Sequence, residues 1–183
     1  TKENKEPVFS ILISFAFVVF GLTNVLQIIS SISNVTPIVS LSNFEYSVRY
    51  GYMYSLILIL IPFVYHLVPK IYGREFIYGR LETFNAYLLG TSVVATLSLN
   101  ALIGINSGFS WNAGANAGNP TIYGEGFLIT WSLISTPYTL ILFLSLLFLL
   151  STFLFTLSTL KAIISGGVTE SETVLEVPGD SYE

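Results

Sequence analysis

Four long tracts without a charged side chain dominate this sequence of 183 residues, and they cover 7–44, 50–69, 83–124 and 126–160. About 20 consecutive apolar residues in a helix cross the roughly 30 Å hydrocarbon core of a bilayer. A helix also satisfies its own backbone hydrogen bonds in lipid, so the tracts predict an all-α membrane protein. We expect a four-helix transmembrane domain at 1–165 and an acidic tail at 166–183. The predicted spans are 8–29, 50–68, 84–105 and 137–160.

Lysine and arginine are distributed unevenly over the predicted connections. Such residues accumulate on the cytoplasmic side of membrane proteins. One side carries only Arg49, whereas the other carries Lys2, Lys5, Lys70, Arg74, Arg80 and Lys161. We therefore expect a multi-pass protein of the cell membrane with both termini, and the acidic tail, in the cytoplasm.

The first span is longer than the apolar core of a signal peptide, and no small-residue cleavage site follows it. We expect it to remain as an anchor.

The two predicted outer connections differ in character. The first, at 30–49, contains the sequon Asn34-Val35-Thr36, which makes Asn34 a candidate glycosylation site. The second, at 106–126, is rich in Gly and Asn, which favour turns. The apolar segment 127–136 would make the last helix over-long, so we expect it to lie along the membrane interface. Pro137 then suits the start of the last span, or a kink in it.

Small and hydroxyl-bearing residues recur in the first and third predicted spans. Such residues let helix backbones approach closely in a membrane. We therefore expect them to face neighbouring helices rather than a polar channel. The positions are Ser10, Ser14, Gly21, Thr23, Gly90, Thr91, Ser92 and Ser98.

Residue types that carry chemistry are scarce in this chain. One His, one Met and no Cys do not supply a bis-histidine heme or a histidine-bound copper. The sequence also has no phosphate-binding loop, no metal-binding helix motif and no catalytic triad, and nothing in it indicates nucleic-acid binding. We expect no catalytic residue, no metal and no cofactor bound by the chain itself.

Ionisable residues inside a bilayer are costly, and they are functional candidates for that reason. Here they lie only near the predicted helix ends. Glu45 and Arg49 are four residues apart and would pair if that segment is helical. At the cytoplasmic side, the candidates for contact with a quinone or a lipid headgroup are His66, Arg74, Arg80 and Glu82. The alternative for each is an ordinary interfacial residue without a ligand.

A more specific signal comes from YHLVPKIYGRE, which begins at Tyr65, and from the helix that starts RLETFNAYLLG and ends LNALIGINSGF. These segments resemble the C-terminal helices of heme–copper oxygen reductase subunit I, most closely the B family and more distantly the C family. In those enzymes a helix begins outside with His-x-His, runs inward, and ends in an aromatic residue, a Leu/Val-Pro step and a Gly-Lys/Arg turn. The matching residues here are Tyr65, Leu67, Val68, Pro69, Gly73 and Arg74.

The heme-ligating histidines of that family have no counterpart in this sequence. Counting back from Pro69, their positions fall at Ser47 and Arg49, and a shift of one helical turn moves them to Gly51 and Met53. The resemblance therefore implies a relative that keeps the helical frame and lacks the heme ligands.

This resemblance implies a noncatalytic accessory subunit of a respiratory heme–copper terminal oxidase, with quinol as one candidate electron donor. Heme and copper would lie in a partner subunit, and the other partners would be membrane subunits, lipid and quinone. The alternative is a small transporter or channel subunit unrelated to respiration. A coupled transporter generally needs an ionisable group in mid-membrane, and this sequence places none there.

Overall fold

The computed structural model describes residues 7–40, 42–72, 80–116 and 120–165. All regular structure in this part of the chain is helical, which confirms the predicted all-α class. Four of the helices are long and apolar enough to span a membrane, so the prediction of four spans is confirmed as well. The helices are α1 (Pro7–Ser30), α2 (Thr36–Val39), α3 (Asn43–Ile71), α4 (Arg80–Asn116) and α5 (Pro120–Ser165).

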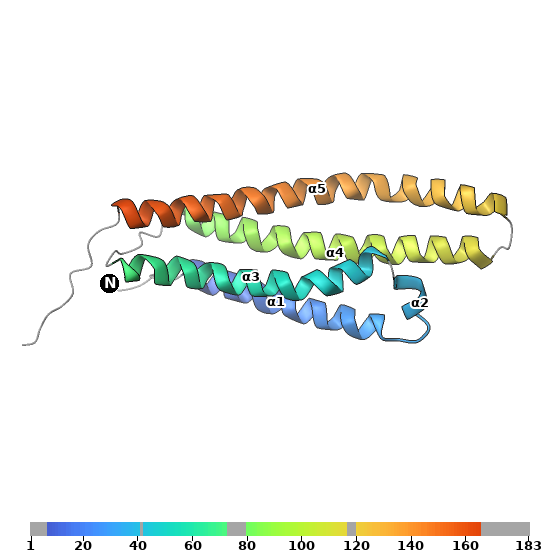
Figure 1. Ribbon diagram of the computed structural model, residues 1–183, viewed down its shortest axis with the longest axis horizontal. Helices are drawn as coiled ribbons and strands as arrows, with labels where there is room; N and C mark the ends of the chain where they lie inside the picture. The colour runs from blue at the N-terminus through green and yellow to red at the C-terminus, as the bar shows by residue number, and fades with distance from the viewer. Residues whose placement is uncertain (1–6, 41, 73–79, 117–119, 166–183) are drawn as a thin grey trace, which may run out of the picture.

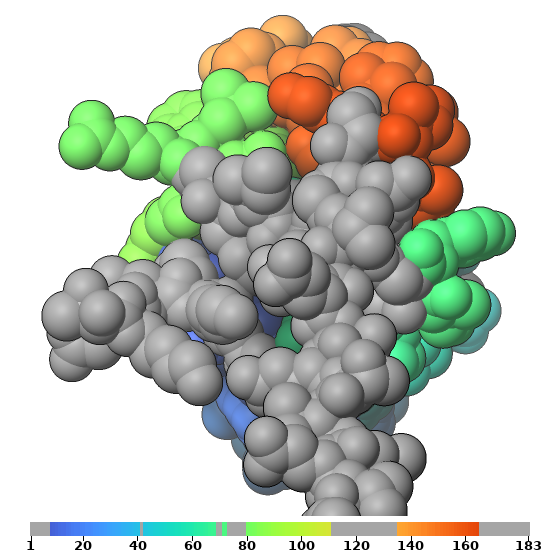
Figure 2. Space-filling view, turned by 90° about the vertical axis from the view of Figure 1, so that its left-hand side faces the viewer, coloured from blue at the N-terminus to red at the C-terminus, as the bar shows by residue number. Residues whose placement is uncertain are grey.

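The four long helices form two antiparallel pairs, α1 with α3 and α4 with α5 (Figure 1). α4 is the central helix because it packs against all the other described helices. In an apolar stretch of 18 residues within each span, 56% of the residues are buried in α4 and 11% in α5. α1 begins and α5 ends at the same end of the bundle, which we call the termini end (Figure 2). The opposite end, where α2 lies, is called the α2 end.

The second predicted outer connection is wrong, because most of it is helical. α4 continues to Asn116 and α5 begins at Pro120, so the paired helices extend past the α2 end of α1 and α3 (Figure 1). The pairing of two long helices here overrides the weak helix propensity of Gly and Asn.

The segment 127–136 belongs to α5 itself, which runs through Pro137 without ending. This helix has 46 residues, and at about 1.5 Å per residue it is about 69 Å long. Membrane helices tolerate an internal proline because neighbouring groups satisfy the carbonyl that it frees.

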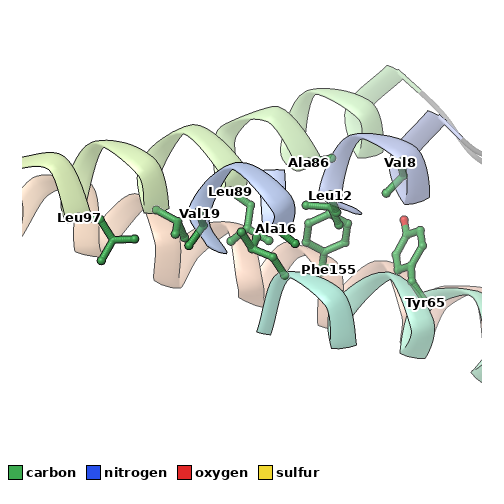
Figure 3. Packing of buried hydrophobic residues seen from close by; sticks show 11 residues of the cluster. Val8, Leu12, Ala16, Val19, Tyr65, Ala86, Leu89, Leu97 and Phe155 are labelled. Atoms are coloured by element: carbon green, nitrogen blue, oxygen red, sulfur yellow. The ribbon is translucent and has the colours of Figure 1, made fainter. Parts of the chain in front are cut away.

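The main core runs along the middle of the bundle. Leu12 of α1, Leu58 of α3 and Leu89 of α4 are fully buried in it. Towards the termini end, Tyr65 of α3 packs edge-on against Phe155 of α5, with ring centroids 5.2 Å apart (Figure 3). Lipid tails are as apolar as leucine, so this core is stabilised by close packing more than by removal of apolar surface from water.

A second core lies at the α2 end, where the connection between α1 and α3 folds against α4. Val39 of α2 and Phe44 of α3 are buried there. Two glycines of α4 permit the close approach. A Cβ at Gly104 would lie 2.0 Å from the backbone nitrogen of Phe44, and one at Gly108 would lie 2.1 Å from the carbonyl oxygen of Ile38. The connection between α1 and α3 therefore contributes apolar packing as well as polar surface.

The predicted packing positions are right in part. Thr23, Gly90 and Ser92 are buried, and a Cβ at Gly90 would lie 2.2 Å from the ring of Phe15 in α1. Ser98 is partly buried. Only one side of a helix can face a given neighbour, and residue type alone does not select that side. The prediction is wrong for four exposed residues, Ser10, Ser14, Gly21 and Thr91.

Candidate functional sites at the two ends of the bundle

Three of the four predicted headgroup residues lie at the termini end, on two helices. His66 is near the end of α3 and partly buried, and its ring centroid lies 6.3 Å from that of Phe9 in α1. Arg80 and Glu82 are in the first turn of α4, the former exposed and the latter partly buried. Arg74 lies outside the described residues. The packing of α1 on α3 brings Phe9 to His66, and the sequence pattern alone does not indicate this neighbour.

An apolar cavity of about 450 Å³ opens between α3 and α5 in the half of the bundle nearer the termini end. Tyr65 and Phe155 form part of its wall, with aliphatic residues around them. Thr152, Thr156 and Thr159 also line it, but their hydroxyls donate to carbonyl oxygens one turn earlier in α5, at 2.9, 3.0 and 2.9 Å. The cavity is therefore suited to a hydrocarbon chain. Of the predicted headgroup residues that the structure describes, His66, Arg80 and Glu82 do not line this cavity.

Two sets of buried hydrogen bonds connect the helices. The hydroxyl of Ser151 in α5 donates to Oδ1 of Asn85 in α4 at 2.6 Å, and Nδ2 of Asn85 donates to the carbonyl oxygen of Ser151 at 3.0 Å. The hydroxyl of Ser47 in α3 donates to the carbonyl oxygen of Leu97 in α4 at 3.1 Å. These three side chains are neutral and buried, so they hold the helices together and contribute no charge to the interior.

The positions that the oxidase resemblance assigns to histidines are closely packed or exposed. Ser47 is fully buried, and a Cβ at Gly51 would lie 2.1 Å from Oγ1 of Thr23 in α1. Arg49 and Met53 face outward from the bundle. Neither Ser47 nor Gly51 offers a nitrogen or sulfur ligand, and the contact at Gly51 leaves no room for a larger side chain. The residues at these positions do not fit a bis-histidine heme site.

A second cavity, more polar and with a volume of about 770 Å³, lies at the α2 end. Its walls come from the end of α1, from α2 and from the start of α3, and we call it the α2-end pocket. Glu45 and Arg49 both line it. They form the predicted ion pair, with Nη2 of Arg49 3.0 Å from Oε1 of Glu45. Hydroxyl groups in α1, in α2 and just after each of them complete much of the wall, from Ser30, Ser31, Thr36 and Ser40.

Sequence reasoning identified this ion pair but missed the pocket around it. The pocket exists because α2 folds back beside α1 and α3, a tertiary arrangement that the polar composition of the connection does not reveal. Asn34 is exposed in the same connection, and its glycosylation stays a prediction.

Among the described residues, no group of three or more His, Cys, Asp or Glu side chains could hold a metal ion. Comparison with protein-family models, with curated proteins and with solved structures finds no match for this chain. The function is therefore inferred from the geometry of the bundle and from the sequence resemblance.

Proposed function

We propose that this chain is a noncatalytic accessory subunit of a respiratory heme–copper terminal oxidase, with quinol as one candidate electron donor. In this proposal it lies in the cell membrane with both termini in the cytoplasm. Heme and copper belong to a partner subunit, and this chain contributes packing, assembly or lipid-facing cover.

The observation that carries the proposal is the chemistry of the bundle interior. The described buried polar groups in the spans are hydroxyls and amides, and hydrogen bonds such as those between Asn85 and Ser151 tie them to neighbouring backbones. A proton relay or an ion pathway needs ionisable groups in the membrane. The charged residues of the described helices lie towards the helix ends instead. An interior of this kind supports a structural role.

The resemblance to oxidase subunit I supports the choice of complex. The likeness lies in the inner end of α3 and in α4, whereas the expected histidine positions carry Ser47 and Arg49, or Gly51 and Met53. Ser47 and Gly51 are closely packed, which supports the view that α3 serves helix packing and not heme binding. We further propose that His66, Arg74, Arg80 and Glu82 contact lipid headgroups or quinone at the cytoplasmic face.

Affinity purification from native membranes tests the proposal. The full chain with an affinity tag is extracted in a mild detergent, and the accompanying proteins are identified by mass spectrometry. We expect a larger chain that carries the histidine ligands of a heme–copper oxidase, in fixed ratio to this one. Recovery of the chain alone, or with an unrelated transport protein, contradicts the proposal and favours the transporter or channel alternative.

A further inference from the structure

We propose that the α2-end pocket binds the headgroup of a phospholipid. Arg49 would hold the phosphate, and Glu45 would accept a hydrogen bond from an amine or hydroxyl of the same headgroup. Residues of this chain form the pocket at the α2 end, whereas His66 lies near the other end of α3. The inference therefore does not depend on the oxidase proposal.

The charges that line the pocket define the ligand class. Among the described residues that line it, Arg49 and Glu45 carry charge, so the complementary ligand has an anionic group together with a hydrogen-bond donor. The side chains of Arg49 and Glu45 are 72% and 43% exposed, which leaves both accessible. Exposed ion pairs contribute little to stability, so a headgroup can separate this one at small cost. A guanidinium also matches phosphate oxygens in a two-point contact.

Contacts between α1 and α3 hold the walls of the pocket together. The hydroxyl of Tyr52 in α3 donates to Oδ1 of Asn24 in α1 at 3.2 Å, and its ring packs edge-on against Phe20 with centroids 5.8 Å apart. Just beside it, Gly51 allows α3 to approach Thr23 of α1. These contacts fix Tyr52 in the wall. Glu45 and Arg49 line the same pocket, next to a surface that packing between α1 and α3 holds in place.

The surroundings of the pocket favour a lipid over a soluble phosphate compound. Tyr52 lies within the span of α3, and tyrosine is enriched where the bilayer meets water. Leu56 lies one helical turn after Tyr52 in α3, and its side chain is exposed. Phe20 of α1, which contacts Tyr52, is exposed as well. A headgroup in the pocket would therefore have its acyl chains along an apolar surface of the same two helices.

Lipid binding to the purified full chain tests this assignment. Native mass spectrometry in detergent measures the apparent affinity for dioleoyl phosphatidylethanolamine, whose headgroup has an N–H donor, and for dioleoyl phosphatidylcholine, whose headgroup has none. We expect about tenfold tighter binding of phosphatidylethanolamine, which corresponds to about 1.4 kcal/mol. Arg49→Gln should weaken both lipids about tenfold. Glu45→Gln should weaken only phosphatidylethanolamine and so remove the preference.

Lys161→Gln is the matched control, since it removes an exposed cation at the termini end. It should leave both affinities unchanged. The proposal is overturned if the wild-type chain binds the two lipids equally. It is also overturned if Arg49→Gln binds like the wild type, or if Glu45→Gln keeps the preference. Arg49 and Glu45 are not buried, so their variants should fold, and a monodisperse elution profile checks this.

Discussion

Single glycines decide how closely the helices of this protein approach one another. At Gly51 and Gly90 a side chain of α1 fills the space that a Cβ would need, and at Gly104 the backbone of Phe44 fills it. A side chain can rotate away from an added methyl group, but backbone can yield only if the helices separate. Gly104, like Gly108, is therefore a position where even a methyl group should have a large effect. Gly21 is the opposite case, with nothing near the site of its Cβ.

We expect Gly104→Ala to lower the free energy of unfolding by about 1–3 kcal/mol, the usual cost of overpacking a core. Gly21→Ala is the matched control and should be neutral, or stabilising by up to about 1 kcal/mol, because alanine is the better helix former. Equilibrium unfolding in mixed detergent micelles, followed by circular dichroism, measures both. Equal stability of the two variants would contradict the close approach of α3 to α4.

Between elements, α5 packs mainly on α4. In an apolar stretch of 18 residues within the described span of α5, 11% of the residues are buried, and Ser151 is one of the described buried residues of this helix. The hydrogen bonds between Asn85 and Ser151 lie in this contact and join the two helices at one level. Interhelical hydrogen bonds in membranes contribute modestly, since the separated helices find other partners.

We expect Ser151→Ala to lower the free energy of unfolding by about 0.6–1.7 kcal/mol, in the range measured for such bonds in membranes. Ser145→Ala is the control, because Ser145 is exposed and its hydroxyl donates within α5, to the carbonyl oxygen of Ile141 at 2.8 Å. The control should change stability by less than about 0.5 kcal/mol. If the two variants unfold alike in the same micelle assay, Ser151 does not join the helices.

The helices themselves were largely predictable, since the charge-free tracts indicate four spans and the structure has four. The ends of the helices were less predictable. Local propensity indicates turns around Asn112 and a helix start at Pro137, but α4 and α5 continue through both positions. The Glu45–Arg49 pair was predictable because it depends only on helical spacing. The α2-end pocket and the neighbour of His66 depend on how separate helices pack, which one sequence does not specify.

Across the bundle, the described basic residues lie at its two ends. The described part of the chain has Arg80 and Lys161 towards the termini end and Arg49 at the α2 end. Since basic residues accumulate on the cytoplasmic side, the termini end should face the cytoplasm.

Cysteine labelling tests this orientation, and the natural chain is suited to it because it has no cysteine. Ser33→Cys is exposed at the α2 end, and Tyr72→Cys is exposed just past the α3 span at the termini end. A membrane-impermeant maleimide added to intact cells should label Ser33→Cys at once and Tyr72→Cys only after permeabilisation. The reverse order of labelling would contradict the predicted orientation.

The proposed accessory role requires a bundle that has no redox centre of its own and lies beside a subunit that has one. We would record a reduced-minus-oxidised visible spectrum, first of the complex in mild detergent and then of this chain after a harsher detergent has removed its partners. We predict strong heme bands in the first sample and none in the second. Heme bands that stay with the isolated chain, or a first sample without heme bands, would rule out the proposed role.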